Sequence, residues 1–152
     1  MPPQRSVQTA LNSTMTNEYL NRIIDRINHD CPYNLANGIT ATSLKEGLST
    51  VEVELRPEHM NIWGLPHGGL IFAVADVASG IAAHSLREGA HIVTAGSSLN
   101  FLSANPEAKR LRAEGRVIRA GRTLNVVQAD VYDETGTHLA TGQFTMYNVQ
   151  QK

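Results

Sequence analysis

Apolar residues near the start of the chain recur at the spacing of one helix face. They fall at i, i+3, i+4 and i+7, at Leu20, Ile23, Ile24 and Ile27. Thr16 stands where a side-chain N-cap is expected, and Glu18 places a negative charge in the first turn, at the positive end of the helix dipole. The pattern predicts an amphipathic helix from residue 16 to about residue 29, followed by a break at Cys31-Pro32.

Six later segments carry the pattern of extended strands. The clearest alternates three apolar residues with three charged ones, Val51, Val53 and Leu55 against Glu52, Glu54 and Arg56. Such alternation is typical of a strand with one buried and one solvated face. Turn-forming residues separate the strands, which we predict at residues 39–44, 48–56, 91–102, 110–119, 123–132 and 138–148, with a loop over 57–66.

The segment from Gly69 to Arg87 shows no amphipathic pattern, because nearly every residue between Leu70 and Leu86 is apolar or small. A helix that is apolar all round is predicted to be buried all round. It is short for a membrane span, and its carboxylate, Asp76, would cost about 2.5 to 3.5 kcal/mol inside a bilayer. We therefore exclude a membrane span, and expect a sheet on one side of this helix and a second copy of the chain on the other.

The composition agrees with one soluble globular domain. The chain has 152 residues, 41% of them hydrophobic, and its 13 Lys and Arg nearly balance 14 Asp and Glu. We assign residues 16–152 to a single domain and residues 1–15 to a flexible leader. The net charge of -1 argues against nucleic-acid binding, and the single cysteine, Cys31, favours a reducing, cytoplasmic location. The six histidines show no metal-binding spacing.

Two neighbouring features carry candidate chemistry. Asp76 is a carboxylate within an apolar helix, where it persists only if it is hydrogen-bonded, paired or used, so a catalytic and a structural role are both open. The triplet His67-Gly68-Gly69 stands where the preceding loop meets the helix. Glycines let a ligand approach the backbone closely, and the N–H groups that begin a helix can bind an oxyanion. A plain tight turn also explains the two glycines.

Three further features allow both a functional and a structural interpretation. His67 is either a general acid–base group or, as we favour, a residue that orients the loop. Asn61 can present its amide to a substrate carbonyl or cap its own loop. Six basic residues against one acid between Lys109 and Arg122 suit the phosphates of a nucleotide carrier, or protect an exposed sheet edge with charge.

Together these residues resemble the hot dog fold thioesterases of the phenylacetyl-CoA, or PaaI-like, branch. The resemblance covers about residues 35–148 and includes Asp76 nine residues after His67. It is carried by the run from Asn61 to Gly69 and by Asn100-Phe101, Ala113-Glu114-Gly115, Gly121-Arg122, Gly136, Ala140 and Phe144. Pro66 and the triplet Ser103-Ala104-Asn105 depart from the family pattern, which bears on how the acyl and pantetheine groups are placed.

The resemblance implies an α+β fold in which an antiparallel sheet of five or six strands wraps around one long central helix. It implies a homodimer as the minimal unit, often paired into a tetramer. The implied activity is hydrolysis of acyl-CoA thioesters without a metal or a separate cofactor, since coenzyme A is part of the substrate.

Carried over by position, the resemblance also implies a set of site residues. Asp76 would be the catalytic carboxylate, Gly68 the amide that polarises the thioester carbonyl, and Asn61 the group that positions thioester or water. Thr94 would help to orient the attacking water. The remaining expected residues lie beside the helix start or contact coenzyme A: His67 and Gly69, and Asn100, Arg119, Gly121 and Arg122.

Helix geometry gives a separate reason to expect the dimer. Gly68 and Asp76 are eight residues apart, which is about 12 Å along a helix that rises about 1.5 Å per residue. One thioester cannot touch both groups. Antiparallel pairing of two such helices across a twofold axis would bring Asp76 of one subunit to Gly68 of the other and create two composite sites.

The favoured function is hydrolysis of a small aromatic or short- to medium-chain acyl-CoA, with Asp76 as general base or nucleophile. A non-catalytic acyl-CoA sensor on the same fold is an alternative, although the sequence before Asn34 offers too little for a DNA-binding helix pair. An acyl-thioester hydratase is a second alternative, and it would require His67 to face the substrate.

Overall fold

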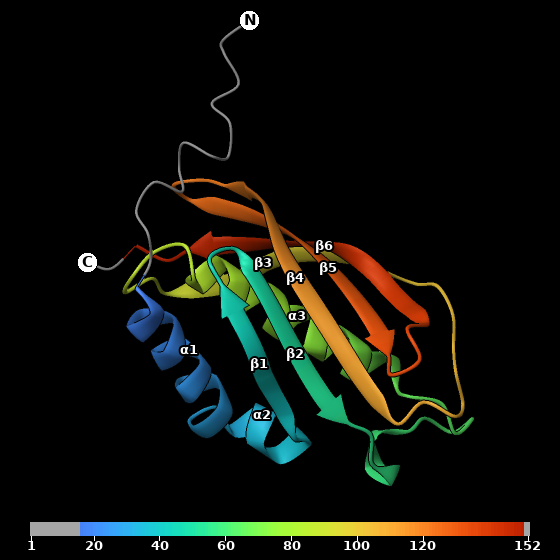
Figure 1. Cartoon of the computed structure of the whole chain (residues 1–152). Helices are drawn as coiled ribbons and strands as arrows, with labels where there is room; N and C mark the ends of the chain where they lie inside the picture. Colours follow the sequence, from blue (N-terminus) through green and yellow to red (C-terminus); the bar gives the residue numbers. More distant parts are fainter. Residues whose placement is uncertain (1–15, 151–152) are drawn as a thin grey trace, which may run out of the picture.

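The computed structural model describes residues 16–150, so the predicted leader at residues 1–15 lies outside the described part of the chain. Six strands form one sheet that wraps around a long helix (Figure 1). The strands are β1 (Ile39–Lys45), β2 (Leu48–Glu54), β3 (Ile92–Phe101), β4 (Arg110–Ala120), β5 (Leu124–Asp133) and β6 (His138–Asn148). Their order across the sheet is β1-β2-β4-β5-β6-β3, and every neighbouring pair is antiparallel. The expected α+β architecture is confirmed, with six strands.

The predicted N-terminal helix is α1 (Asn17–His29), and it begins where its cap was expected. The Thr16 hydroxyl accepts a hydrogen bond from the Tyr19 backbone N–H at 3.3 Å. The Tyr19 hydroxyl in turn lies within hydrogen-bond distance of the carbonyl oxygens of His84 and Arg87, at 2.8 and 2.7 Å. These contacts tie α1 to the C-terminal end of the central helix.

A short helix, α2 (Pro32–Asn37), replaces the break that the sequence suggests at Cys31-Pro32. Proline is suited to the first turn of a helix, where its missing N–H has no partner to lose. Gly38 ends α2 in the left-handed conformation, with φ 68°, which a glycine adopts without strain. The loop predicted over 57–66 also contains one 3₁₀ turn at Pro57–His59.

The central helix is α3 (Gly68–His84), and at Ala78 it packs tightly against β2 and β4. The Ser49 hydroxyl donates to the Ala78 carbonyl at 2.6 Å. A Cβ at Gly115 would lie 2.6 Å from the same carbonyl oxygen, so only glycine fits between helix and sheet there. Around this contact the core is filled by fully buried side chains, among them Val51, Val74, Leu111, Val127, Val131 and Phe144.

A single chain buries one side of the central helix, so the predicted burial all round would need the expected second copy, which stays a prediction. Nine of its residues are buried against the sheet. The opposite face is half-buried or exposed along its whole length, at Gly69, Phe72, Ala73, Asp76, Val77, Gly80 and His84. We call these seven residues the open stripe. The sheet of one chain therefore covers one side of α3 only.

The strand β3 forms one edge of the sheet, since it pairs with β6 alone. Its side chains are exposed almost throughout, which leaves both its outer edge and part of its surface beside the open stripe uncovered. Across residues 16–150, no helix has the length and apolar character needed to cross a membrane.

Candidate active site

Asp76 and Thr94, which the sequence places far apart, meet between α3 and β3. The Thr94 hydroxyl donates to Asp76 Oδ1 at 2.5 Å. Within the described chain, the second carboxylate oxygen, Oδ2, has no hydrogen-bond donor. Asp76 lies on the open stripe and is half-buried, so it is less desolvated in one chain than its apolar helix suggests. The result is an acid with one oxygen held in place and the other free to act.

The start of α3 leaves one particular backbone amide unused. His67 is the N-cap, and its Nδ1 accepts a hydrogen bond from the Gly69 N–H at 2.8 Å. The Gly68 N–H has no acceptor among residues 16–150. Of the two glycine amides that the sequence offered, Gly68 therefore supplies the free donor at the positive end of the helix dipole.

His67 acts on the loop in the way we favoured from the sequence, as a capping residue. Because Nδ1 accepts a hydrogen bond, the neutral ring carries its proton on Nε2. A Cβ at Gly69 would lie 2.9 Å from His67 Nδ1, so this close approach accounts for the second glycine. The capping bond does not exclude the acid–base role expected for His67, which stays a prediction.

Asn61 holds its own loop through its side-chain oxygen. Oδ1 accepts hydrogen bonds from the backbone N–H groups of Trp63 at 2.9 Å and Leu65 at 3.1 Å. Its Nδ2 has no acceptor in the described part of the chain, so the amide can cap the loop and still donate outward. Asn61 and Gly68 both line a cavity of about 200 Å³ at the N-terminal end of α3.

The aromatic ring of Phe101 completes this end of the helix, and we did not single it out as a site residue. Two of its ring carbons would lie 3.4 Å from a Cβ at Gly68, so the ring lies directly beside Gly68. Ser103, Ala104 and Asn105, which depart from the family pattern, line the same cavity. They therefore shape the space next to Gly68.

The two clusters do not meet within one chain. Asp76 and Thr94 lie at the middle of α3, whereas Asn61, Gly68 and Phe101 lie at its N-terminal end. The helix is continuous between Gly68 and Asp76, so they stay separated by about 12 Å.

The residues expected to contact coenzyme A are also divided between the ends of α3. Asn100 precedes Phe101 and therefore lies near the N-terminal end. Gly121 and Arg122 line a separate cavity of about 220 Å³ together with Ala83, Leu86 and Arg87, at the C-terminal end. Arg119 is the second-last residue of β4, just before Gly121 and Arg122.

The turn between β4 and β5 has a defined shape. A Cβ at Gly121 would overlap the Leu124 carbonyl oxygen, which requires glycine at this position. Asn148 Nδ2 donates to the carbonyl oxygens of Gly121 at 3.2 Å and Arg122 at 2.9 Å. The turn is therefore fixed by a side chain from β6.

Two of the six basic residues between Lys109 and Arg122 form salt bridges with glutamates on the surface of the sheet. Arg110 pairs with Glu54 at 2.5 Å, and Arg112 pairs with Glu114 at 2.9 Å. The three arginines nearer the turn form no salt bridge with any described residue: Arg116, Arg119 and Arg122. In residues 16–150 no group of three or more His, Cys, Asp or Glu is placed to hold a metal ion.

Comparison with solved structures first identifies the fold. The PaaI protein of the Escherichia coli phenylacetic acid degradation operon superposes with a TM-score of 0.81 at 20% identity, covering 89% of this chain and 96% of that one. A six-stranded antiparallel sheet wrapped around one long helix is the hot dog fold that the sequence resemblance implied.

Sequence comparison then identifies the family. Residues 64–140, which include α3 and the strands that follow it up to the start of β6, match the Thioesterase superfamily. The chain belongs to this superfamily of thioester-cleaving enzymes.

Two relatives carry more specific descriptions. Human acyl-coenzyme A thioesterase 13 is 27% identical over 110 residues, which are 72% of this chain and 79% of the human protein. A Streptococcus mutans protein, solved bound to acetyl CoA, is 31% identical with a TM-score of 0.68, over 75% of this chain and 90% of that one.

Proposed function

We propose that the protein hydrolyses acyl-CoA thioesters at a site built by two subunits. The observation that carries the proposal is the hydrogen bond from Thr94 to Asp76 on the open stripe. This bond orients the acid, whereas the free amide of Gly68 in the same chain lies about 12 Å away along α3. The acid therefore needs the amide of a second chain. Two relatives favour this substrate class: one is named an acyl-coenzyme A thioesterase, and another was solved with acetyl CoA.

In the proposed reaction the thioester carbonyl oxygen accepts a hydrogen bond from the Gly68 N–H of one subunit. Asp76 of the other subunit then acts in one of two ways. As a general base it takes a proton from water while the water oxygen bonds to the carbonyl carbon, the carbon–sulfur bond breaks, and the leaving thiolate of coenzyme A receives that proton. As a nucleophile its Oδ2 bonds to the carbonyl carbon and displaces the thiolate, which takes a proton from water, and a second water hydrolyses the resulting anhydride. Both routes release the acyl group as a carboxylic acid and restore Asp76. An oxyanion donor of this kind typically contributes about 2.7 to 4 kcal/mol to transition-state stabilisation.

The second subunit is part of the proposal because the open stripe needs a partner. Phe72 and Val77 place apolar surface on the stripe, and Phe72 remains 38% exposed. Antiparallel packing of two α3 helices along this stripe covers that surface and brings Gly68 of each subunit toward Asp76 of the other. It also unites Asn61 and Asn100 with the acid. Pairing of two dimers into a tetramer and a cytoplasmic location stay predictions, as does independence from any added cofactor or metal.

Replacement of Asp76 by Asn tests the role of the acid. The side chain keeps its size and can still accept from Thr94, so the fold and the oligomer should persist. Because an amide neither accepts a proton nor attacks a carbonyl, thiol release from saturated acyl-CoA substrates should fall by about 10² to 10⁴. Full activity of Asp76→Asn would refute the proposal.

The wild-type protein separates the alternatives in the same assay. A non-catalytic sensor would bind saturated acyl-CoA without releasing thiol. A hydratase would leave saturated acyl-CoA intact and add water to an unsaturated one. Thiol release with catalytic turnover supports the thioesterase.

A further inference from the structure

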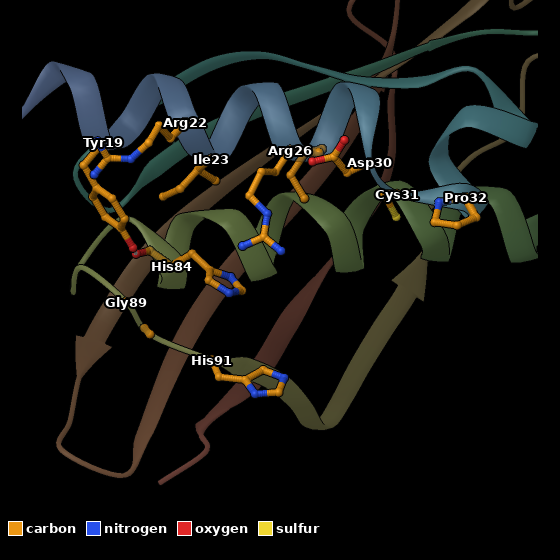
Figure 2. A pocket seen from close by; sticks show the side chains of 12 residues that line it. Tyr19, Arg22, Ile23, Arg26, Asp30, Cys31, Pro32, His84, Gly89 and His91 are labelled. Carbon is orange, nitrogen blue, oxygen red and sulfur yellow. Dashed lines mark hydrogen bonds between the residues drawn. The ribbon is translucent and has the colours of Figure 1, made fainter. Parts of the chain in front are cut away.

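A third cavity, of about 780 Å³, opens between α1, the C-terminal end of α3 and the residues that lead into β3 (Figure 2). This volume falls within the range of about 300 to 1,000 Å³ that is typical of small-molecule sites. Ile23 and Ile27 of α1 and Ala90 supply apolar wall. None of the residues assigned so far to catalysis or to coenzyme A lines this cavity.

Four of the side chains that line the cavity can carry positive charge: Arg22, Arg26, His84 and His91. Figure 2 shows the Arg26 side chain extending from α1 toward His84 on α3, with the ring of His91 across the opening. In residues 16–150 the Arg26 guanidinium forms neither a salt bridge nor a hydrogen bond. One turn earlier, Arg22 is held by Glu18 at 3.0 Å and by Glu88 at 2.8 Å. Arg26 is thus the available cation of the two.

None of the other polar groups that line the cavity pairs with the Arg26 guanidinium in residues 16–150. Asp30 is the one acid among the lining residues, and it forms no salt bridge with Arg26 in the described chain. The Tyr19 hydroxyl is engaged by carbonyl oxygens. The His84 Nδ1 lies 2.9 Å from the Gly80 carbonyl oxygen and donates to it. Burial lowers the pKa of His84, and the nearby His91 and Arg26 lower it further.

Two elements lead from the Asp76–Thr94 pair to this cavity. On α3, Asp76, Gly80 and His84 follow one another at four-residue steps on the open stripe, so they share one face. A Cβ at Gly80 would meet nothing within 4 Å, which leaves room beside the helix. Along the chain leading into β3, His91 comes three residues before Thr94. Asp76 and His84 are about 12 Å apart along the helix, and Thr94 and His91 are about 10 Å apart along the extended chain.

We propose that this cavity receives the far end of the acyl group and that Arg26 selects acyl chains ending in a carboxylate. The inference rests on the proposed function, because it assumes that the thioester carbon lies at Asp76. Carbon–carbon bonds of about 1.5 Å advance a zigzag chain by about 1.25 Å each, so about eight to ten bonds span the path. The apolar walls suit the methylene chain, whereas the phosphates of coenzyme A would find a single unpaired arginine there.

Paired substrates test the selection directly. The specificity constant kcat/KM is measured for decanedioyl-CoA and decanoyl-CoA, which differ only in the terminal carboxylate. Arg26 is exposed, so solvent screens its contact with the carboxylate, and the wild type should prefer the diacid ester by about two- to fivefold. Arg26→Gln should bring the ratio to about one. Arg22→Gln, the matched control on the same helix, should keep the wild-type ratio because its charge is already paired.

The inference is wrong if the wild type treats the two esters alike or prefers decanoyl-CoA, or if Arg26→Gln keeps the preference. A binding experiment separates this failure from failure of the proposed function. Calorimetry compares the monomethyl ester of decanedioic acid with methyl decanoate, on the wild type and both variants. If no acyl-CoA is hydrolysed, the proposed function fails. Binding of the acid ester that Arg26→Gln abolishes still supports the cavity's role, and equal binding of the two esters overturns it.

Discussion

At the scale of single residues, the acid and the helix start of the candidate site each have one hydrogen-bonded atom and one atom without a partner among the described residues. Thr94 occupies one oxygen of Asp76 and leaves the other, while His67 occupies the amide of Gly69 and leaves that of Gly68. In both places a neighbouring side chain fixes the geometry and leaves one atom without a hydrogen bond among the described residues. A site with this division of labour needs little rearrangement when substrate binds.

The role of the Gly68 amide can be tested by removing its hydrogen alone. Proline at the first position of a helix is well tolerated, and His67 already has the extended backbone that a residue before proline requires, with φ -63° and ψ 134°. Gly68→Pro should therefore fold normally. Loss of the single oxyanion donor should lower kcat by about 10² to 10³.

Gly68→Ala is the control for this substitution. Alanine keeps the N–H, and its Cβ would lie 3.4 Å from the ring of Phe101, an ordinary contact. Turnover of acyl-CoA should therefore stay much closer to that of the wild type. If both variants lose the same amount of activity, the added bulk beside Phe101 explains the loss, and the amide hydrogen does not.

The sequence predicts individual residues well where their role is set by local chemistry. Asp76 stands out as an acid in an apolar helix, and Thr16 as a cap, because both signals lie within one segment. Phe101 and Arg26 give no such signal, since each acquires its role from an element that is distant in sequence. His84 does have a signal in the sequence that we did not use: it lies eight residues after Asp76, on the same helix face.

At the scale of elements, the turn between β5 and β6 is built around the carboxylate of Asp133. Oδ1 accepts from the backbone N–H groups of Thr135 at 2.9 Å and Thr137 at 3.0 Å, and Oδ2 accepts from Asn105 Nδ2 at 2.8 Å. The bond to Asn105 anchors the segment that lines the cavity beside Gly68. The turn thereby supports one end of the candidate site.

These bonds predict how stability depends on pH. Burial raises the pKa of Asp133, but hydrogen bonds from Thr135, Asn105 and Thr137 outweigh it and lower the pKa from 3.8 to about 2. Because the folded pKa is the lower one, the carboxylate stabilises the fold fully above about pH 4 and loses this effect as the pH falls toward 2. The lost stabilisation is about 2 kcal/mol.

Urea unfolding at a series of pH values between 2 and 7 measures this contribution. Asp133→Asn should lower the free energy of unfolding at pH 7 and flatten its decline between about pH 4 and pH 2. An unchanged decline in the variant would assign the acid sensitivity to other carboxylates.

Elements are predicted from sequence when their pattern is periodic. The alternation in β2 and the helical spacing in α1 each place one face toward the core, and both elements form where expected. The short α2 is missed because Pro32 was taken as a break, although a proline at the start and Gly38 after the end are typical helix boundaries. For α3 the sequence predicts that one side faces a second copy, but it does not predict which residues form the open stripe. An apolar surface that faces a partner and one that faces the core have the same composition.

At the scale of the whole molecule, the proposed site exists only between two chains. Each chain carries both halves, an acid pair at the middle of α3 and an amide cluster at its start, about 12 Å apart. Two chains with different defects should therefore complement one another. Asp76→Asn homodimers lack the acid in both sites, and Gly68→Pro homodimers lack the amide in both.

Refolding an equal mixture of the two variants tests this arrangement. Half of the dimers formed at random should contain one chain of each kind, and in these one site combines the intact Asp76 of one chain with the intact Gly68 of the other. The second site carries both defects, so the mixture should regain about a quarter of the wild-type turnover. Native mass spectrometry of the mixture measures the fraction of dimers that contain one chain of each kind. If subunits exchange and the two variants together remain as inactive as each alone, acid and amide act within one chain. The antiparallel pairing of α3 would then be wrong, even if both residues prove necessary for hydrolysis.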